Sequence, residues 1–332
     1  MRYSSHDESG LARVLSFLKS HNTEYLSGQD LSDVLKISRV AVWKHIKKIR
    51  ELGYAIESKQ KLGYRLESDT DALLPWEITS GLDTVSVGRR VYYFETVEST
   101  QSQAMKMASD GEEDGTVVIA QRQSKGRGRG GRTWVSPEGG IWLSVILRPR
   151  FDVSIMTLFP MAASLALSKA VKRSLGIQTE LKWPNDLTLK GEKVAGMLVD
   201  VSLESNKIED LVLGVGINFD IDVKNVKRLL KGTPNFYGVA SLTKNKKPRP
   251  KALVQAFLKE LEDIYLRMNR GKTKEITREW TKVSSTIGRN VMISTVDGKI
   301  SGRALRIDDD GALVISKNNR TARIMAGDVA HA

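Results

Sequence analysis

Cysteine is absent from the 332-residue sequence. Disulfide bonds, thiolate nucleophiles and cysteine-ligated zinc or iron–sulfur clusters are therefore excluded. The histidines are few and too scattered to form a recognisable metal motif, at His6, His21, His45 and His331. Any chemistry must come from other side chains.

Long apolar runs are also scarce. The first residues contain no apolar core of a signal peptide, and the most apolar stretch, residues 158–171, is interrupted by two serines and a lysine. We therefore expect a cytoplasmic protein with no membrane partner. The sequence also lacks G-x-x-x-x-G-K-[ST], so a nucleotide, if bound, is not held by a Walker P-loop.

Acidic residues are fewer than basic ones. The sequence contains 39 Asp and Glu and 52 Lys and Arg, which gives a formal net charge of +13. This excess favours anionic partners through long-range steering, although a generally lysine-rich proteome would produce it too. With 40% hydrophobic residues, the chain is long enough for roughly two to three globular domains.

Basic residues are concentrated in residues 123–134, which read Q-S-K-G-R-G-R-G-G-R-T-W. Glycines let backbone N–H groups approach an anion, and the arginines between them add charge and paired hydrogen bonds. Apolar strand candidates at 116–120 and 141–147 flank the stretch, which favours a binding loop over a solvated or nonspecific nucleic-acid-binding segment. A dinucleotide-binding G-x-G-x-x-G is set aside, because Pro137 and two glycines prevent the helix that this motif requires.

The N-terminal part of the chain has the pattern of a winged helix-turn-helix. Apolar residues recur at helical spacing in 11–18 and 31–35, and Ser38 begins a third helix that ends at Gly53. A tight turn separates the last two helices, and a hairpin with lysines at its tip follows. One face of the third helix suits bases and phosphates, with Arg39, Val40, Trp43, Lys44 and Lys47. Alternatively, the module mediates protein contacts and its lysines are only solvated.

Strand-like and helical stretches alternate loosely from residue 91 to residue 268, which favours an α+β fold over a Rossmann sheet. Four short polar motifs stand out in this region: E-S-T-Q at 98–101, K-W-P-N-D-L at 182–187, K-V-A-G at 193–196 and G-V-G-I-N at 214–218. Each alone is typical of a helix cap, a packed turn or a strand end. Their combination with the glycine/arginine stretch is more specific.

The stretch G-R-G-R-G-G-R-T-W followed by K-W-P-N-D-L, K-V-A-G and G-V-G-I-N resembles the biotin protein ligase family. With the winged helix in front, essentially the whole chain resembles the family's bifunctional form, which is also a biotin operon repressor. The resemblance implies a winged helix-turn-helix at 1–67, a class II synthetase-like mixed α/β ligase domain at 75–275 and a small SH3-like β-barrel at 276–332. The chain departs from the family at Gln101, where Asn is common, and at Gly130, where some members carry Arg.

The resemblance implies a reaction in two steps. Biotin and ATP form biotinyl-AMP and pyrophosphate, and the biotinyl group then passes to a lysine of a biotin carboxyl carrier protein. Lys193 and Arg129 are the implied catalytic residues, and Asp186 is a candidate Mg²⁺ ligand. The implied biotin contacts are Ser99, Thr100, Gln101, Gln123, Arg127, Gly128, Arg129 and Lys193. The implied ATP contacts are Arg132, Trp134, Lys182 and Asn218.

The C-terminal residues carry turn signals at short spacing, which predict strands at 290–294, 299–307, 312–316 and 321–325. This module either closes over ATP, touches the carrier or serves only as a packing cap. The resemblance further implies operator DNA as a partner and a homodimer when biotinyl-AMP is bound.

Two other functions compete with this interpretation. A lipoate protein ligase would share the catalytic fold, but the winged helix and the form of the glycine/arginine stretch favour biotin. A ligand-sensing transcription regulator without ligase activity would need neither Arg129 nor Lys193, and both are present.

Overall fold

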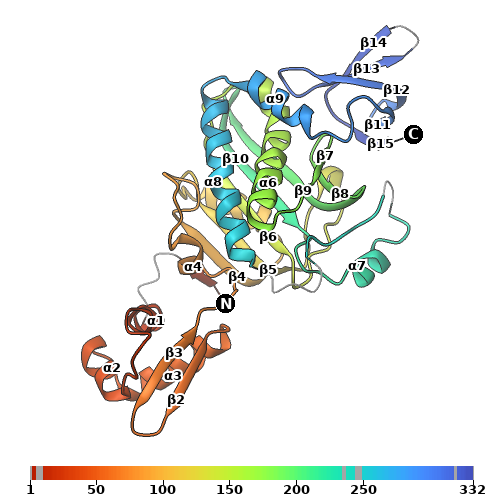
Figure 1. Cartoon of the computed structure of the whole chain (residues 1–332). Coiled ribbons are helices and arrows are strands. Elements are labelled where there is room, and N and C mark those ends of the chain that lie inside the picture. The colour runs from red at the N-terminus through yellow and green to blue at the C-terminus, as the bar shows by residue number, and fades with distance from the viewer. Residues whose placement is uncertain (1, 5–9, 234–236, 244–248, 318–319, 332) are drawn as a thin grey trace.

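The computed structural model describes residues 2–4, 10–233, 237–243, 249–317 and 320–331. An N-terminal helical bundle, a central sheet with helices and a C-terminal β module follow one another along the molecule (Figure 1).

The N-terminal bundle has three helices and a hairpin. They are α1 (Gly10–Ser20), α2 (Gly28–Leu35), α3 (Arg39–Glu51), β2 (Ala55–Lys59) and β3 (Gly63–Ser68). A capping box begins α2, because the Ser27 hydroxyl accepts from the Asp30 amide while the Asp30 carboxylate accepts from the Ser27 amide. The Ser38 hydroxyl caps α3 in the same position. The predicted winged helix-turn-helix is confirmed.

The central sheet has eight strands in the order β1-β4-β5-β6-β10-β9-β8-β7. Their bounds are β1 (Arg2–Ser4), β4 (Val91–Val97), β5 (Val117–Gln123), β6 (Ile141–Leu147), β7 (Glu180–Lys182), β8 (Asp186–Leu189), β9 (Glu192–Glu204) and β10 (Lys207–Ile217). Only β4 and β5 run parallel among the paired strands of this sheet that the structure describes. This mixed order confirms the predicted α+β fold.

Helices cover both faces of the sheet. The helix α5 (Thr100–Ser109) packs against Val118, Ile146 and Val212. Their neighbours along the strands point the other way, as alternation in a strand requires, and join the larger core with α6 (Phe159–Leu175) and α8 (Pro250–Asn269). The sheet is therefore buried on both faces.

The segment Val153–Leu175 is long and apolar enough to cross a membrane, and it is the one such helix among the residues with a described structure. It comprises a short 3-10 turn and α6. In the most apolar part of this segment, 61% is buried inside the fold. There, α6 contacts α8, α9 (Thr273–Lys282) and β9. The core therefore accounts for its apolar character.

The first strand lies outside the N-terminal bundle, although the domain predicted at residues 1–67 includes it. β1 is the edge strand of the central sheet and pairs with β4, with Tyr3 opposite Tyr93. The Tyr3 ring also meets the Trp76 ring edge to face at 5.7 Å. A three-residue strand carries no local pattern that would reveal such distant pairing.

A buried ionic cluster joins the bundle to the central unit. Glu77, in α4 (Pro75–Thr79), is fully buried. Its carboxylate accepts hydrogen bonds from Tyr54 at 2.6 Å, from Lys251 of α8 at 3.0 Å and from Lys19 of α1. A buried carboxylate is costly without such partners, so these bonds hold the two units together at α4.

The C-terminal module is a five-stranded antiparallel sheet in the order β14-β13-β12-β11-β15. The strands are β11 (Asn290–Thr295), β12 (Gly298–Ile307), β13 (Leu313–Lys317), β14 (Arg320–Ile324) and β15 (Asp328–His331). The first four match the predicted strands, and β15 was missed. The helix α9, which spans the predicted boundary at residue 276, packs against α6 and α8 of the central unit and against β12 of this module.

Candidate functional site

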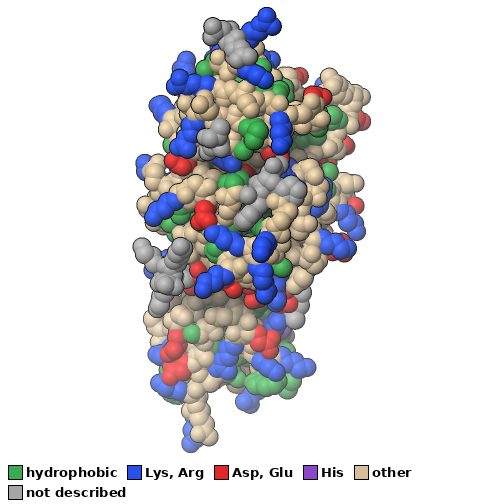
Figure 2. All heavy atoms as spheres, turned by 90° about the vertical axis from the view of Figure 1, so that its right-hand side faces the viewer, with side chains coloured by type: hydrophobic (Ala, Val, Ile, Leu, Met, Phe, Trp, Pro, Cys, Tyr) green, Lys and Arg blue, Asp and Glu red, His purple; other side chains and the backbone are tan. Residues whose placement is uncertain are grey.

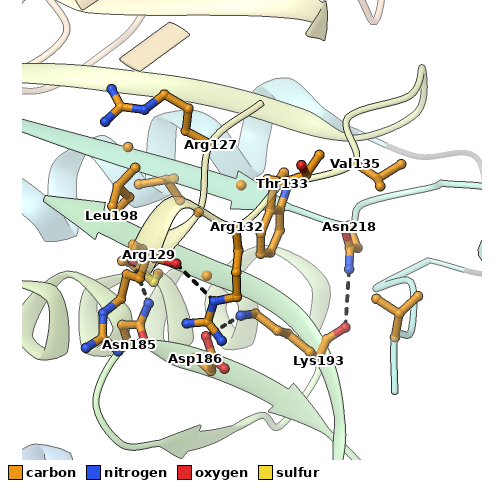
Figure 3. A pocket seen from close by; sticks show the side chains of 18 of the residues that line it. Arg127, Arg129, Arg132, Thr133, Val135, Asn185, Asp186, Lys193, Leu198 and Asn218 are labelled. Carbon is orange, nitrogen blue, oxygen red and sulfur yellow. Dashed lines mark hydrogen bonds and ion pairs between the residues drawn. The ribbon is translucent and has the colours of Figure 1, made fainter. Parts of the chain in front are cut away.

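A cavity of about 170 Å³ lies between the central sheet, the glycine/arginine loop and β15. It is lined by every residue that was predicted to bind biotin or ATP, and by Asp186 (Figure 3). These residues are Ser99, Thr100, Gln101, Gln123, Arg127, Gly128, Arg129, Arg132, Trp134, Lys182, Asp186, Lys193 and Asn218. The fold thus brings together motifs that lie far apart in the sequence.

The glycine/arginine loop connects β5 to β6 as an ordered turn. Its two arms are joined by the hydrogen bonds from the Gly128 amide to the Arg132 carbonyl at 2.7 Å and from the Trp134 amide to the Gly126 carbonyl at 2.8 Å. Gly130 has a φ of +61° and its successor one of +73°, which other residues rarely adopt. The loop is therefore an ordered turn, and it does not begin a dinucleotide-binding helix.

One end of the cavity is a neutral, hydrogen-bonded wall at the start of α5. Ser99 caps this helix. The side-chain oxygen of Gln123 accepts hydrogen bonds from the Thr100 amide at 2.7 Å and from the Thr100 hydroxyl at 3.1 Å. The side-chain NH₂ of Gln123 donates to the Ser136 hydroxyl at 2.8 Å. The Gln101 side chain is fully engaged within the wall, donating to the Val212 carbonyl and accepting from Ser144.

The opposite end carries the charges. The Lys193 ammonium lies 2.6 Å from one Asp186 oxygen, and the Tyr237 hydroxyl donates to the other at 2.6 Å. Arg129 donates to the Asn185 side-chain oxygen at 3.0 Å and is largely desolvated, which lowers the pKa of its guanidinium. Arginine stays charged at neutral pH even so. Lys193 and Arg129 therefore offer two fixed cations to one cavity (Figure 3).

Lys182 is the most enclosed of these cations. Its ammonium lies 3.2 Å from the centre of the Tyr237 ring. Burial lowers the pKa of Lys182 to about 8, and nearby Lys193 adds to this effect, while Asp186 and Asp328 oppose it. Near neutral pH a bound anion would stabilise the charged form of this lysine.

Several lining residues were missed by the sequence analysis. Tyr237 and Asp328, whose carboxylate pairs with Arg132 at 3.0 Å, come from distant segments that carry no motif. Asn185 lies within K-W-P-N-D-L, so that motif was a usable signal for it. Apolar residues of and around α7 (Val223–Leu229) also line the cavity, namely Val226, Leu230 and Val239.

Gly216 makes room for the Trp134 ring. A Cβ at this glycine would lie 2.5–2.9 Å from three atoms of the indole, whose ring centre is 5.0 Å from the Lys193 ammonium. If Trp134 contacts ATP, as the resemblance implies, Gly216→Ala should displace the indole and raise the KM for ATP by roughly ten-fold, equal to about 1.4 kcal/mol. Gly28→Ala, whose Cβ has room, is the control. An unchanged KM for ATP would argue against the position assigned to Trp134.

The exposed face of α3 forms a second candidate site. Val40 is 64% exposed and Trp43 is 53% exposed, although both are apolar. The remaining exposed members of this face are Arg39, Lys44 and Lys47. The opposite side of α3 is buried through Val42, Ile46 and Ile49. In Figure 2, Lys and Arg side chains are spread over one side of the molecule, from the C-terminal module at the top to the hairpin at the bottom.

Known protein families match the three units in the same order. The biotin/lipoate A/B protein ligase family matches residues 93–218, an HTH domain matches residues 11–65, and the biotin protein ligase C-terminal domain matches residues 286–332. The solved structure of the biotin protein ligase from Aquifex aeolicus in complex with biotin and ATP has a TM-score of 0.59 and 26% identity, covering 73% of this chain and 98% of that chain.

Full-length relatives share the whole arrangement. The bifunctional ligase/repressor BirA of Bacillus subtilis is 33% identical over 318 residues, covering 95% of this chain and 97% of that protein. The protein of the same name from Escherichia coli is 26% identical over 310 residues, covering 93% of each. The resemblance that the motifs carry is thus confirmed, and the chain belongs to the biotin protein ligase family, in its bifunctional ligase/repressor form.

Proposed function

We propose that the cavity joins the carboxylate of biotin to the α-phosphate of ATP, releases pyrophosphate, and then passes the biotinyl group to a lysine of a biotin carboxyl carrier protein. The observation that carries this proposal is the convergence of Lys193 and Arg129 on a cavity whose other end is a neutral hydrogen-bonding wall. Biotin-dependent exchange of pyrophosphate into ATP tests the first step, and labelling of a carrier domain offered biotin and lipoate tests the second.

The neutral wall suits the polar, uncharged ring system of biotin. We assign the ring to Ser99, Thr100 and Gln123, with the loop residues Arg127 and Gly128 beside it. Gln101 lines the same wall, and its side-chain amide is hydrogen-bonded to Val212 and Ser144, as that of Gln123 is to Thr100 and Ser136. We assign Gln101 to the same end of biotin, where these bonds hold its side chain against β6 and β10.

The cations at the charged end reduce the electrostatic repulsion between the carboxylate of biotin and the α-phosphate of ATP. Two fixed cations lower the energy of bringing these anions together, and they need no reorganisation when charge shifts to the new bond. The pairing with Asp186 holds the Lys193 ammonium in the cavity. Lys193 therefore neutralises part of the negative charge of the reacting groups. Arg129, which is positioned by its hydrogen bond to Asn185, supplies a second positive charge beside them.

ATP is assigned to the remaining part of the cavity. Lys182 and Arg132 supply charge for its phosphates, and Asn218, which donates to the Lys193 carbonyl at 3.2 Å, steadies the strand beside them. The indole of Trp134 and the apolar residues around α7 suit the adenine base.

Mg²⁺ does not fit as an ion held by this protein alone. Both oxygens of Asp186 already face a partner, because one lies 2.6 Å from the Lys193 ammonium and the other accepts a hydrogen bond from Tyr237. Within the described part of the chain, no group of three or more His, Cys, Asp or Glu is placed to hold a metal. Mg²⁺ would therefore arrive with ATP and keep phosphate oxygens and water as its ligands.

The N-terminal bundle is assigned to operator DNA. The exposed face of α3 supplies both charge and apolar contact, as reading bases in a major groove requires. A homodimer that forms when biotinyl-AMP is bound would present two such faces to two half-sites. Cytoplasmic location agrees with operator DNA and a carrier protein as partners.

The affinity for ATP should fall as the pH rises through about 8, the pKa that burial gives Lys182. The lysine is charged below that pH and neutral above it, so we expect the KM for ATP to increase about ten-fold between pH 7 and pH 9. Steady-state kinetics across this range measures the effect. Lys182→Arg should flatten the profile, and a flat profile in the unmodified protein would contradict the assignment.

A further inference from the structure

The exposed face of α3 offers hydrogen-bond donors and apolar surface, and no acceptor. Its members are Arg39, Val40, Trp43, Lys44 and Lys47. The guanidinium, the two ammonium groups and the indole N–H can only donate hydrogen bonds, and the valine can do neither. This restricts the bases that the face can recognise.

The acceptors that α3 does carry lie elsewhere on the helix. In α3, which the structure describes in full, only the side chains of His45 and Glu51 can accept a hydrogen bond. His45 is turned towards α1, because a Cβ at Gly10 would lie 2.6 Å from its Nε2. Glu51 is the last residue of the helix and pairs with Lys48 at 3.3 Å. The hydroxyl of Ser38, directly before the helix, serves as its cap.

The outward direction of this face is fixed by the packing of the bundle. The opposite side of α3 is buried, and the turn that leads into the helix is held by two hydrogen bonds. The Ser32 hydroxyl donates to the Ile37 carbonyl at 2.6 Å, and Arg13 donates to the Leu35 carbonyl at 2.9 Å. The face is therefore presented to a partner in a single orientation.

Two apolar side chains form the centre of the face. Val40 and Trp43 are three positions apart, so they are neighbours on the helix surface. The Lys47 ammonium lies 6.0 Å from the centre of the Trp43 ring. Of the α3 side chains, only Lys48 and Glu51 form ion pairs with residues that the structure describes. The cations around the apolar pair therefore remain available to an anionic partner.

Duplex DNA fits this surface better than a protein does. A protein partner would have to supply carboxylates around an apolar patch of two side chains, which is far smaller than the interface of a stable protein complex. DNA offers phosphates on both sides of a groove in which one base, thymine, carries a methyl group.

The chemistry of the face selects among the bases. In the major groove, cytosine and adenine present amino groups that need a protein acceptor, whereas guanine presents two acceptors and thymine presents one acceptor and its C5-methyl group. Donors and apolar side chains together therefore match guanine and thymine. Of these two bases, only thymine gives Val40 and Trp43 an apolar partner.

We propose that Val40 and Trp43 read the C5-methyl groups of two thymines in the major groove of each operator half-site. This inference rests on the assignment of the N-terminal bundle to operator DNA. Side chains three positions apart have Cβ atoms about 5–6 Å from each other. Successive bases of one strand are about 3.4 Å apart along the helix axis, so the two thymines lie one or two base steps apart. The surrounding cations contact phosphates and guanine.

The test removes one methyl group at a time from the DNA. The full-length protein, with biotin and ATP, first selects a duplex from a random pool. Each thymine of a half-site is then replaced in turn by deoxyuridine, which lacks only the C5-methyl group. We expect the affinity to fall about four-fold at two positions one or two base steps apart, the effect of one buried methyl group.

Two variants assign the methyl groups to their side chains. Val40→Ala should make the affinity insensitive to deoxyuridine at one of the two positions, and Trp43→Ala should do so at the other. Neither variant removes a charge, so the slope of log affinity against log salt should stay that of the unmodified protein. The control is Val296→Ala, which shortens a fully exposed valine in the turn between β11 and β12. It should keep both effects.

Several outcomes would overturn the inference. They are a selected half-site without thymine, an affinity that ignores deoxyuridine at every position, and methyl effects that persist in both variants. A Trp43→Ala protein with normal affinity for DNA and an altered mass in sedimentation would show that the apolar pair contacts protein, which also overturns it. An unmodified protein that selects no duplex from the pool would instead refute the assignment of the N-terminal bundle to DNA.

Discussion

Replacing Lys193 by alanine is expected to slow biotinyl-AMP formation by about 10²–10³-fold, the usual cost of removing one preorganised group that stabilises developing charge. The ammonium is fixed by Asp186 at 2.6 Å and faces the same cavity as Arg129. Without it, the carboxylate of biotin and the α-phosphate of ATP approach each other with one cation fewer. Pyrophosphate exchange and direct detection of biotinyl-AMP would measure the loss.

Three controls make this result specific to the reaction. Lys207→Ala removes the same charge from an exposed position at the start of β10 and should leave the rate unchanged. Thermal unfolding should show that the Lys193→Ala protein remains folded, because this side chain lies at a cavity and not in the core. Biotin binding measured without ATP should weaken less than the rate falls. A Lys193→Ala protein that makes biotinyl-AMP at the normal rate would refute the role of this lysine.

The sequence could reveal the parts of the site that are encoded locally. The glycine/arginine stretch, K-W-P-N-D-L and G-V-G-I-N are each contiguous, so each can be recognised without knowledge of the fold. The helices of the N-terminal bundle were also predictable, because apolar residues such as Leu11, Leu15 and Leu18 of α1 recur with the period of a buried helix face. The caps at Ser27 and Ser38 mark where two of those helices begin.

The contributions of distant segments could not be predicted in this way. Tyr237 reaches Asp186 only because its segment lies beside β9, where the Ala240 amide donates to the Lys193 carbonyl at 3.0 Å. Asp328 reaches Arg132 because β15 lies at the edge of the C-terminal sheet that is next to the cavity. Neither contact leaves a periodic or spaced pattern in the sequence. The charge balance of the cavity is therefore a property of the tertiary structure.

The triple variant Arg39→Ala/Lys44→Ala/Lys47→Ala is expected to lose roughly 10³-fold in affinity for DNA while keeping its ligase activity. Each lost base or phosphate contact costs on the order of 1–3 kcal/mol. These side chains are exposed on α3. Fluorescence anisotropy with a duplex that the unmodified protein selects from a random pool would measure the affinity.

The dependence on salt distinguishes direct phosphate contact from a change in the fold. Loss of contacts to phosphate should reduce the slope of log affinity against log salt by about one for each cation removed. Ligase activity should persist, because the exposed face of α3 contributes nothing to the lining of the cavity. Lys106→Ala/Lys172→Ala/Lys207→Ala removes equal charge from exposed positions of the central unit and should change the affinity far less. If both triple variants weakened DNA binding equally, the net charge of the chain, and not the third helix, would be the source of its affinity.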